Sequence, residues 1–183
     1  MIDLPNIGAL LDAGKYEEAA EVYLLMGLRG LFEARFDPDT VGDRTYREDL
    51  AYLLHAMDNA LHASQTGTAE GIFRLALPLF DQYQSRRSGM PAAITEELVG
   101  DGYLMLGDER CLEHYEAAAD RYDEIDPDPM EMVDWGITDG TMMAQTALWT
   151  TLERRGVDRP DDIELTADFH GRIEFKRSLA TGL

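Results

Sequence analysis

The stretch ELVGDGYLMLGDERCLEHYEAAADRY, residues 97–122, decides the fold class, because two helical patterns meet in it at a Gly-Asp turn. Upstream of the turn, apolar residues follow Pro91 and predict a helix over 91–106 with the proline in its first turn. Downstream, Asp108 is a typical N-cap, and apolar residues recur every three or four positions, which predicts a second helix over 109–125. The stripe of this second helix consists of Leu112, Tyr115, Ala119 and Tyr122.

The same helical period covers most of the remaining chain. Further helices are predicted over residues 15–36, 44–64, 68–85 and 130–155. In the third of these, Pro78 is expected to cause a kink. Four apolar segments run into a glycine that another helical segment follows, at Gly14, Gly67, Gly107 and Gly156. This layout predicts a mainly α fold of stacked antiparallel helical hairpins, with one domain over residues 1–156.

Beyond Gly156 the period of the apolar residues changes to two. Apolar and polar residues alternate from Ile163 onward, and Phe169-His170-Gly171 can form a three-residue loop. In that register Asp168 faces Arg172, and the apolar residues share the other face of the ribbon. We therefore expect residues 157–183 to contain a short C-terminal β-hairpin that covers its apolar face on the helical domain or on a second chain. A final helix over the same residues is the alternative.

Two places in the chain resemble the tetratricopeptide repeat, in which a glycine turn closes a pair of antiparallel helices. The first is Gly14-Lys15-Tyr16-Glu17-Glu18-Ala19 followed by Tyr23, and the second is Val99-Gly100-Asp101-Gly102-Tyr103 followed by Gly107-Asp108. The chain departs from the family at Glu96, where the repeat has a tryptophan, and the first match lacks the closing proline. The resemblance covers about a third of the chain.

The resemblance implies a tetratricopeptide-like superhelix or irregular bundle that binds peptide or protein segments in a groove, and it implies no chemistry. The family's groove positions fall on Asp12, Glu97, Asp101, Leu104 and Met105. These five are the candidate partner-binding residues, and the alternative is that they are solvated acids and core apolar residues. The expected function is a non-catalytic binding or scaffold module whose partner is a peptide, another protein or a second copy of the chain.

Acidic residues are in large excess along the chain: 36 Asp and Glu against 16 Lys and Arg, a formal net charge of -20, and only two of the basic residues are lysines. This composition resembles proteins of halophilic archaea, where molar salt screens the repulsion between dispersed carboxylates. An acidic face for a basic partner is the alternative. Without a basic patch we expect no nucleic-acid binding. One cysteine, no signal-peptide pattern and no long apolar run predict a cytoplasmic protein outside the membrane.

Candidate chemistry is confined to weak patterns. The best metal-like spacing is His55-x2-Asp58-x3-His62 on one helix face, but no second set of ligands completes it, so we expect no metal and treat the three as boundary residues. Cys111-x2-His114 is incomplete in the same way. No cofactor or nucleophile motif is present, and no cofactor is expected. A small helical enzyme or metal protein that uses the His55 face remains the alternative function.

Overall fold

The computed structural model describes residues 5–36, 43–84, 89–125, 139–159 and 169–182. In this part of the chain there are helices and no strands, so the predicted mainly α class is confirmed. The helices α2 (Tyr16–Phe36), α3 (Asp43–His62), α4 (Thr66–Gln84), α5 (Met90–Leu106) and α6 (Cys111–Ile125) lie within a few residues of their predicted bounds. Of the helix predicted over 130–155, the described part is α8 (Asp139–Arg154), since residues 130–138 lie outside the described chain. The short α1 (Ile7–Asp12) and the C-terminal α9 (Phe169–Ala180) were not among the predicted helices.

Four of the helices end in the same hydrogen-bonded turn. At the end of α5, the amide of Gly107 donates to the carbonyl of Leu104 and the next amide donates to the carbonyl of Tyr103, both at 3.0 Å. This is the Schellman pattern, which needs a left-handed residue. Glycine supplies that residue after α1, α5 and α8, but after α3 it is Ser64, with φ 61°. Gly67, which we predicted as the second turn glycine, lies inside α4 instead.

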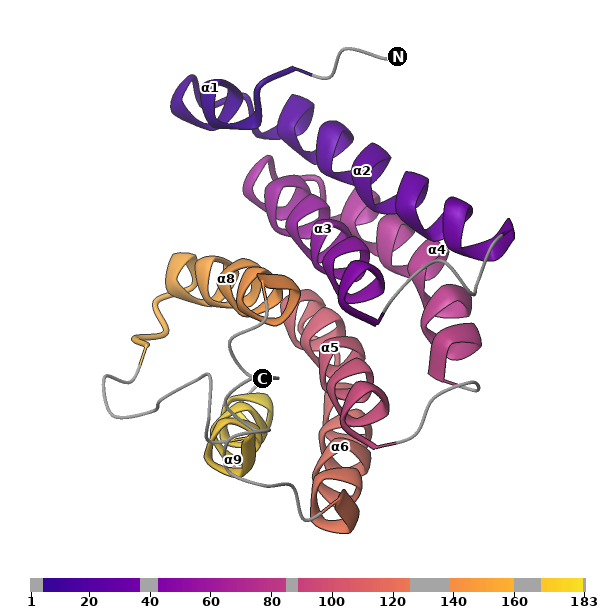
Figure 1. The fold of residues 1–183 in the computed structure, drawn as a ribbon. Coiled ribbons are helices and arrows are strands. Elements are labelled where there is room, and N and C mark those ends of the chain that lie inside the picture. Colours follow the sequence, from indigo (N-terminus) through magenta and orange to yellow (C-terminus); the bar gives the residue numbers. More distant parts are fainter. Residues whose placement is uncertain (1–4, 37–42, 85–88, 126–138, 160–168, 183) are drawn as a thin grey trace.

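The helices form two groups, and the contacts of α5 with α3 and α4 and of α8 with α3 join them (Figure 1). In the first group α3 lies between α2 and α4, and α1 packs on α2. In the second group α5 pairs with α6, while α8 returns to contact both α3 and α5, and α9 packs on α6. The C-terminal helices therefore cover faces of the earlier helices that successive hairpins alone would leave open.

The helix α5 is buried on nearly every side because other helices approach it closely. A Cβ atom at Gly100 would lie 2.6 Å from the Tyr115 ring of α6, and one at Gly102 would lie 2.3 Å from the Phe73 ring of α4. The two glycines thus let α5 approach both neighbours. The consequence is that polar residues of α5 lie in the interior, where each needs a partner.

The prediction of a C-terminal β-hairpin is wrong for residues 169–176, which belong to the helix α9. Residues 163–168, the first strand of the predicted hairpin, lie outside the described part of the chain. The helix forms because its buried residues recur at helical spacing. They are Phe169, Arg172, Ile173, Lys176 and Ala180. Two of these five residues are cations, so the buried face of the helix is not recognisable as an apolar stripe in the sequence. The alternation of apolar and polar residues therefore favoured the strand prediction over the helix.

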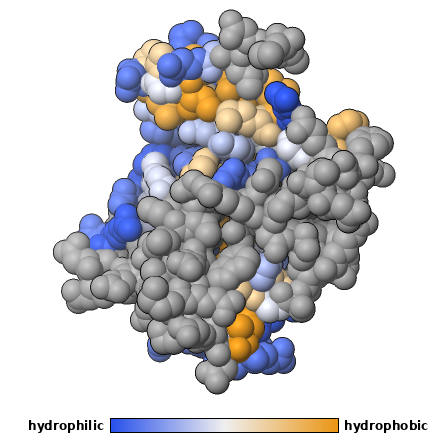
Figure 2. All heavy atoms as spheres, in the orientation of Figure 1, coloured by the Kyte–Doolittle hydropathy of each residue, from blue (hydrophilic) through white to orange (hydrophobic). Residues whose placement is uncertain are grey.

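The described residues contain no helix that is long and apolar enough to cross a membrane. On the face shown in Figure 2, apolar side chains gather at the end of the molecule formed by α1 and α2. Elsewhere on that face hydrophilic residues dominate wherever the structure is described.

Candidate functional site

A buried charge cluster lies between α5 and α9 and contains two of the predicted site residues. It consists of Glu97, Asp101, Arg172 and Lys176, whose exposed fractions are 1%, 0%, 0% and 0%. The acids come from α5 and the bases from α9, 75 or more residues later in the chain. Two carboxylates and two cations bring the formal charge of the cluster to zero.

Glu97 is the acceptor at the centre of this cluster. The Arg172 guanidinium donates to both carboxylate oxygens, from Nε to Oε1 and from Nη2 to Oε2, each at 2.5 Å. Lys176 Nζ donates to Oε1 at 2.6 Å, and the Tyr122 hydroxyl of α6 donates to Oε2 at 2.9 Å. A two-pronged guanidinium contact of this kind fixes the orientation of both groups as well as their distance.

Asp101 lies one turn further along α5 and is held by different groups. Lys176 Nζ contacts its Oδ1 at 2.7 Å and its Oδ2 at 2.9 Å, so the lysine bridges the two carboxylates. The Tyr115 hydroxyl of α6 donates to Oδ1 at 2.9 Å. From α8, Gln145 Nε2 reaches both acids at 3.3 Å. Four helices therefore contribute polar atoms to the same interior site.

Burial by itself would raise the pKa of both carboxylic acids. At Glu97, the effect of burial is more than offset by the positive charges of Arg172 and Lys176, which hold the pKa of the Glu97 carboxyl well below its usual range. For Asp101, burial outweighs the lowering effect of Lys176, and its pKa is raised. Burial and the neighbouring carboxylates also raise the pKa of Tyr115 and Tyr122, which keeps both hydroxyls as protonated donors.

Two polar atoms on α8 lie beside this network without a hydrogen bond in the described structure. They are Gln145 Oε1 and Trp149 Nε1, one helical turn apart. The Trp149 ring contacts the Phe175 ring of α9, with centroids 5.6 Å apart. The interior polar site is therefore bounded by an aromatic pair on its α8 side.

The other predicted partner-binding residues are distributed differently. Leu104 and Met105 are fully buried in α5, and their backbone carbonyls accept hydrogen bonds from Arg155. Asp12 is exposed at the end of α1, which packs on α2. Four of the five groove positions thus lie inside the protein, and the structure does not bring Asp12 together with them on an open surface.

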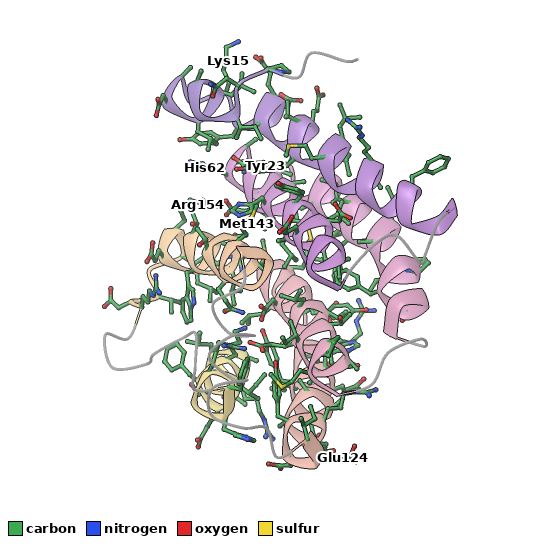
Figure 3. All side chains as sticks on the ribbon, in the orientation of Figure 1. Lys15, Tyr23, His62, Glu124, Met143 and Arg154 are labelled. Atoms are coloured by element: carbon green, nitrogen blue, oxygen red, sulfur yellow. The ribbon has the colours of Figure 1, made fainter. Side chains whose placement is uncertain are left out.

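His55, Asp58 and His62, the three residues with metal-like spacing at which no metal is expected, make packing contacts between helices. His55 stacks on Tyr23 of α2, with ring centroids 4.9 Å apart, and His62 stacks on Tyr16 at 3.5 Å. Asp58 accepts a hydrogen bond of 2.6 Å from the Thr151 hydroxyl and forms an ion pair with Arg154; both partners belong to α8. Figure 3 shows Tyr23, His62 and Arg154 near the junction of α2, α3 and α8.

No group of three or more His, Cys, Asp or Glu side chains in the described residues is arranged to hold a metal ion. Burial raises the pKa of the Cys111 thiol to about 11, which disfavours the reactive thiolate. His114 is instead held by Glu96, whose Oε1 lies 2.8 Å from its Nδ1.

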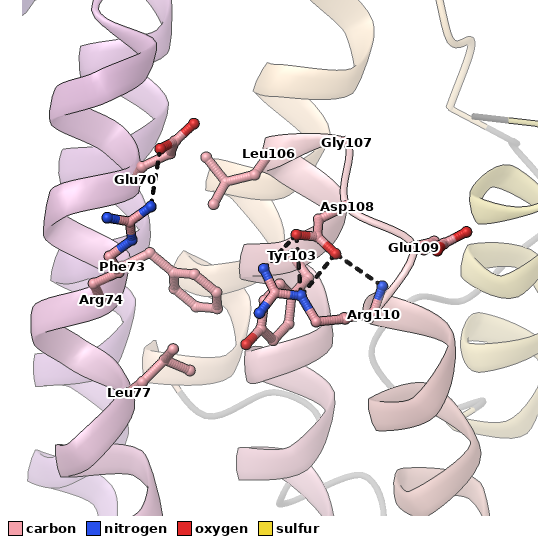
Figure 4. A pocket seen from close by; sticks show the side chains of 10 residues that line it. All are labelled: Glu70, Phe73, Arg74, Leu77, Tyr103, Leu106, Gly107, Asp108, Glu109 and Arg110. Atoms are coloured by element: carbon pink, nitrogen blue, oxygen red, sulfur yellow. Dashed lines mark hydrogen bonds and ion pairs between the residues drawn. The ribbon is translucent and has the colours of Figure 1, made fainter.

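An open cleft lies between α4 and the turn that joins α5 to α6 (Figure 4). We call it the α4–α5 cleft; its volume is about 470 Å³. Both sides of the cleft carry apolar and charged residues. The apolar ones are Phe73, Leu77, Tyr103 and Leu106, and the charged ones are Glu70, Arg74, Asp108, Glu109 and Arg110. The Phe73 and Tyr103 rings meet edge to face, with centroids 4.7 Å apart.

The charges of the cleft are largely paired with one another. Arg110 lies over the Tyr103 ring at 4.5 Å and contacts Asp108 at 2.5 Å, while Arg74 contacts Glu70 at 3.4 Å. Glu109 is exposed and its side chain points away from the apolar residues of the cleft in Figure 4, and the lining contains three acids and two arginines. Sequence reasoning missed this cleft, because its walls come from α4 and from a turn about 30 residues later, and no local motif joins them.

Comparison of the chain with protein-family models, with curated proteins and with solved structures found no match. The geometry of the cleft and of the buried charge cluster is therefore the basis for the function proposed below.

Proposed function

We propose that this chain is a non-catalytic binding module whose α4–α5 cleft takes an apolar side chain from a basic segment of a partner protein. The observation that carries the proposal is the cleft itself, an open hollow in which α4 on one side and α5 with its following turn on the other each contribute apolar and charged residues. Its volume lies in the range usual for binding sites, and its lining combines apolar residues with an equal or larger share of charged ones. The resemblance to tetratricopeptide repeats, which bind peptide segments, points the same way.

The basic character of the partner follows from charge. The chain has a formal net charge of -20, and the two arginines of the cleft are each paired with an acid of the cleft. A cationic segment is therefore attracted by the negative charge of the whole molecule. An anionic segment would have to break an existing ion pair against that net repulsion.

Two substitutions with a matched control test the cleft. Leu77→Gln and Leu106→Gln each remove a half-buried apolar group from its wall, whereas Leu75→Gln changes a 50% exposed leucine of α4 outside the cleft. The probe is a library of labelled peptides with a central Leu or Phe and either basic or acidic flanks, followed by fluorescence anisotropy. Burying one such side chain stabilises binding by about 1.5–3 kcal/mol, so each cleft variant should weaken binding at least about tenfold.

The control variant should bind the peptides like the wild-type chain, and peptides with basic flanks should bind better than those with acidic flanks. Equal binding of the two libraries would contradict the predicted basic partner. Equal losses in the cleft variants and in Leu75→Gln would show that the cleft is not the binding site. Binding should also weaken as KCl is raised, since salt screens the attraction between partner and chain.

A further inference from the structure

The helix α9 is held in a slot that recognises charge as well as shape. The slot is the surface of α5, α6 and α8 that α9 covers, with Glu97, Asp101, Tyr115, Tyr122 and Gln145 as its polar residues. All five are buried by the docked helix and its neighbours. The position of α9 beside α6 is visible in Figure 1.

The contacts define the helix that the slot accepts. An arginine must reach Glu97, and a lysine one turn later must bridge Glu97 and Asp101. An aromatic residue one turn before the arginine stacks on the slot, as Phe169 does on Tyr122 with ring centroids 4.8 Å apart. Only a helix brings residues at positions i, i+3 and i+7 onto one face. The accepted pattern is therefore an aromatic residue, then Arg, then Lys at helical spacing.

This pattern serves selectivity more than stability. A buried ion pair and an apolar contact of the same size contribute about equally to stability, because desolvation offsets the attraction between the charges. A helix without the two cations would leave both acids of the slot buried and unpaired, which is strongly unfavourable. The slot therefore rejects neutral and acidic helices far more effectively than an apolar slot could.

The docked helix has properties of an intramolecular ligand. A free helix of 12 residues is marginal in water, so α9 depends on the slot for its structure. It belongs to the same chain as the slot, so its binding there is intramolecular and a free helix has to compete with it. A partner helix with more favourable contacts can compete with a ligand held in this way.

We propose that the slot is a second binding site, for a basic amphipathic helix of a partner protein, and that α9 is its resident competitor. The site is separate from the α4–α5 cleft, since no slot residue lines the cleft. The occupant is basic because the slot presents two buried carboxylates. It is helical because α9 binds there as a helix.

The test uses the full-length chain and a labelled synthetic peptide of residues 169–183 as the probe. In the variant Arg172→Gln the resident helix loses its contact with Glu97, while the slot is unchanged. This variant should bind the probe at least about tenfold more tightly than the wild-type chain, because its competitor is weaker. A control peptide that carries Arg172→Gln and Lys176→Gln should not bind.

Circular dichroism shows whether the Arg172→Gln chain remains folded. If it does not, Phe169→Ala weakens the resident helix by removing a buried ring that packs on Tyr122 and Arg172, and it replaces Arg172→Gln in the experiment. Equal affinity of the wild-type and the weakened chain for the probe would overturn the proposal, as would equal binding of the control peptide. Light scattering gives one more outcome. A concentration-dependent particle of about twice the 20.5 kDa chain mass, dissolved by the probe, would make a second copy the occupant and overturn the assignment to a different protein.

Discussion

Replacing Lys176 by methionine tests the buried charge cluster most directly. The ammonium group contacts Glu97 at 2.6 Å and Asp101 at 2.7 Å and 2.9 Å, and it has no access to solvent. Methionine keeps most of the side-chain length but removes the charge. Glu97 retains Arg172, whereas Asp101 is left with only neutral donors, from Tyr115 and Gln145. The variant therefore leaves one buried negative charge without a counter-ion.

The expected cost follows from that unpaired charge. Breaking a buried ion pair by removing one partner lowers the free energy of unfolding by about 3–5 kcal/mol. For a chain of this length each 1 kcal/mol lowers the thermal midpoint by about 2–4 °C, so the midpoint should fall by roughly 6–20 °C. The matched control is Lys15→Met, because Lys15 is the chain's other lysine and pairs with Glu18 at the surface. It should cost less than about 1 kcal/mol.

Urea unfolding followed by circular dichroism measures both variants at fixed salt. Burial already raises the pKa of Asp101, and without the lysine that pKa rises further. The folded Lys176→Met chain then binds a proton more readily than the unfolded chain, so its deficit should shrink as pH falls from about 8 to 5. Asp101→Asn in the same chain should recover part of the loss at neutral pH. A cost of Lys176→Met within about 1 kcal/mol of the Lys15→Met control would refute the reasoning.

Other parts of the structure give further predictions. Gly100→Ala places a Cβ 2.6 Å from the Tyr115 ring and should lower the free energy of unfolding by about 1–3 kcal/mol. Gly71→Ala places a Cβ with no atom within 4 Å and should raise the free energy of unfolding by up to about 1 kcal/mol. Urea unfolding of both variants measures the two changes. Burial lowers the pKa of His55, so the unfolded chain binds its proton first, near pH 6.5; the thermal midpoint should fall as pH drops below that value, and less so in His55→Gln. The thermal midpoint should rise from about 0.1 to about 3 M KCl if the acidic composition is an adaptation to salt; a flat or falling midpoint contradicts it. Elemental analysis should find no stoichiometric transition metal; near-molar zinc, iron or manganese lost on His62→Ala would contradict this.

Most of the helices could be predicted because each buries an apolar stripe that is visible within its own sequence. The turns after α1, α5 and α8 could be predicted as well, since glycine is the residue that best adopts the left-handed conformation there. Ser64 could not, because a serine with positive φ is uncommon and Gly67, three residues later, is the more obvious candidate. The cause is local in every one of these cases, whether the prediction succeeded or failed.

The charge cluster could not be predicted, because its cause is not local. Arg172 and Lys176 look like surface residues until Glu97 and Asp101 are placed opposite them, and the acids look like surface residues for the same reason. The one sequence signal was that all four polar residues occupy the buried side of their helices at helical spacing. In a chain with this many acids, two more carboxylates did not stand out. The tetratricopeptide resemblance selected Glu97 and Asp101 as notable positions but assigned them to an open groove.

A cluster in which four charges cancel also constrains how this chain can evolve. Loss of one member leaves an uncompensated charge in the interior, so a single substitution at any of the four positions lowers the yield of folded protein. The cluster can be lost only when an acid and its partner base are both replaced, and each single replacement on the way gives a less stable protein. Glu97 and Asp101 should therefore vary in step with Arg172 and Lys176 among descendants of a common ancestor, either all retained or all replaced by apolar residues. We therefore expect the two acids and the two bases to be inherited together, although at least 71 positions separate any acid from any base.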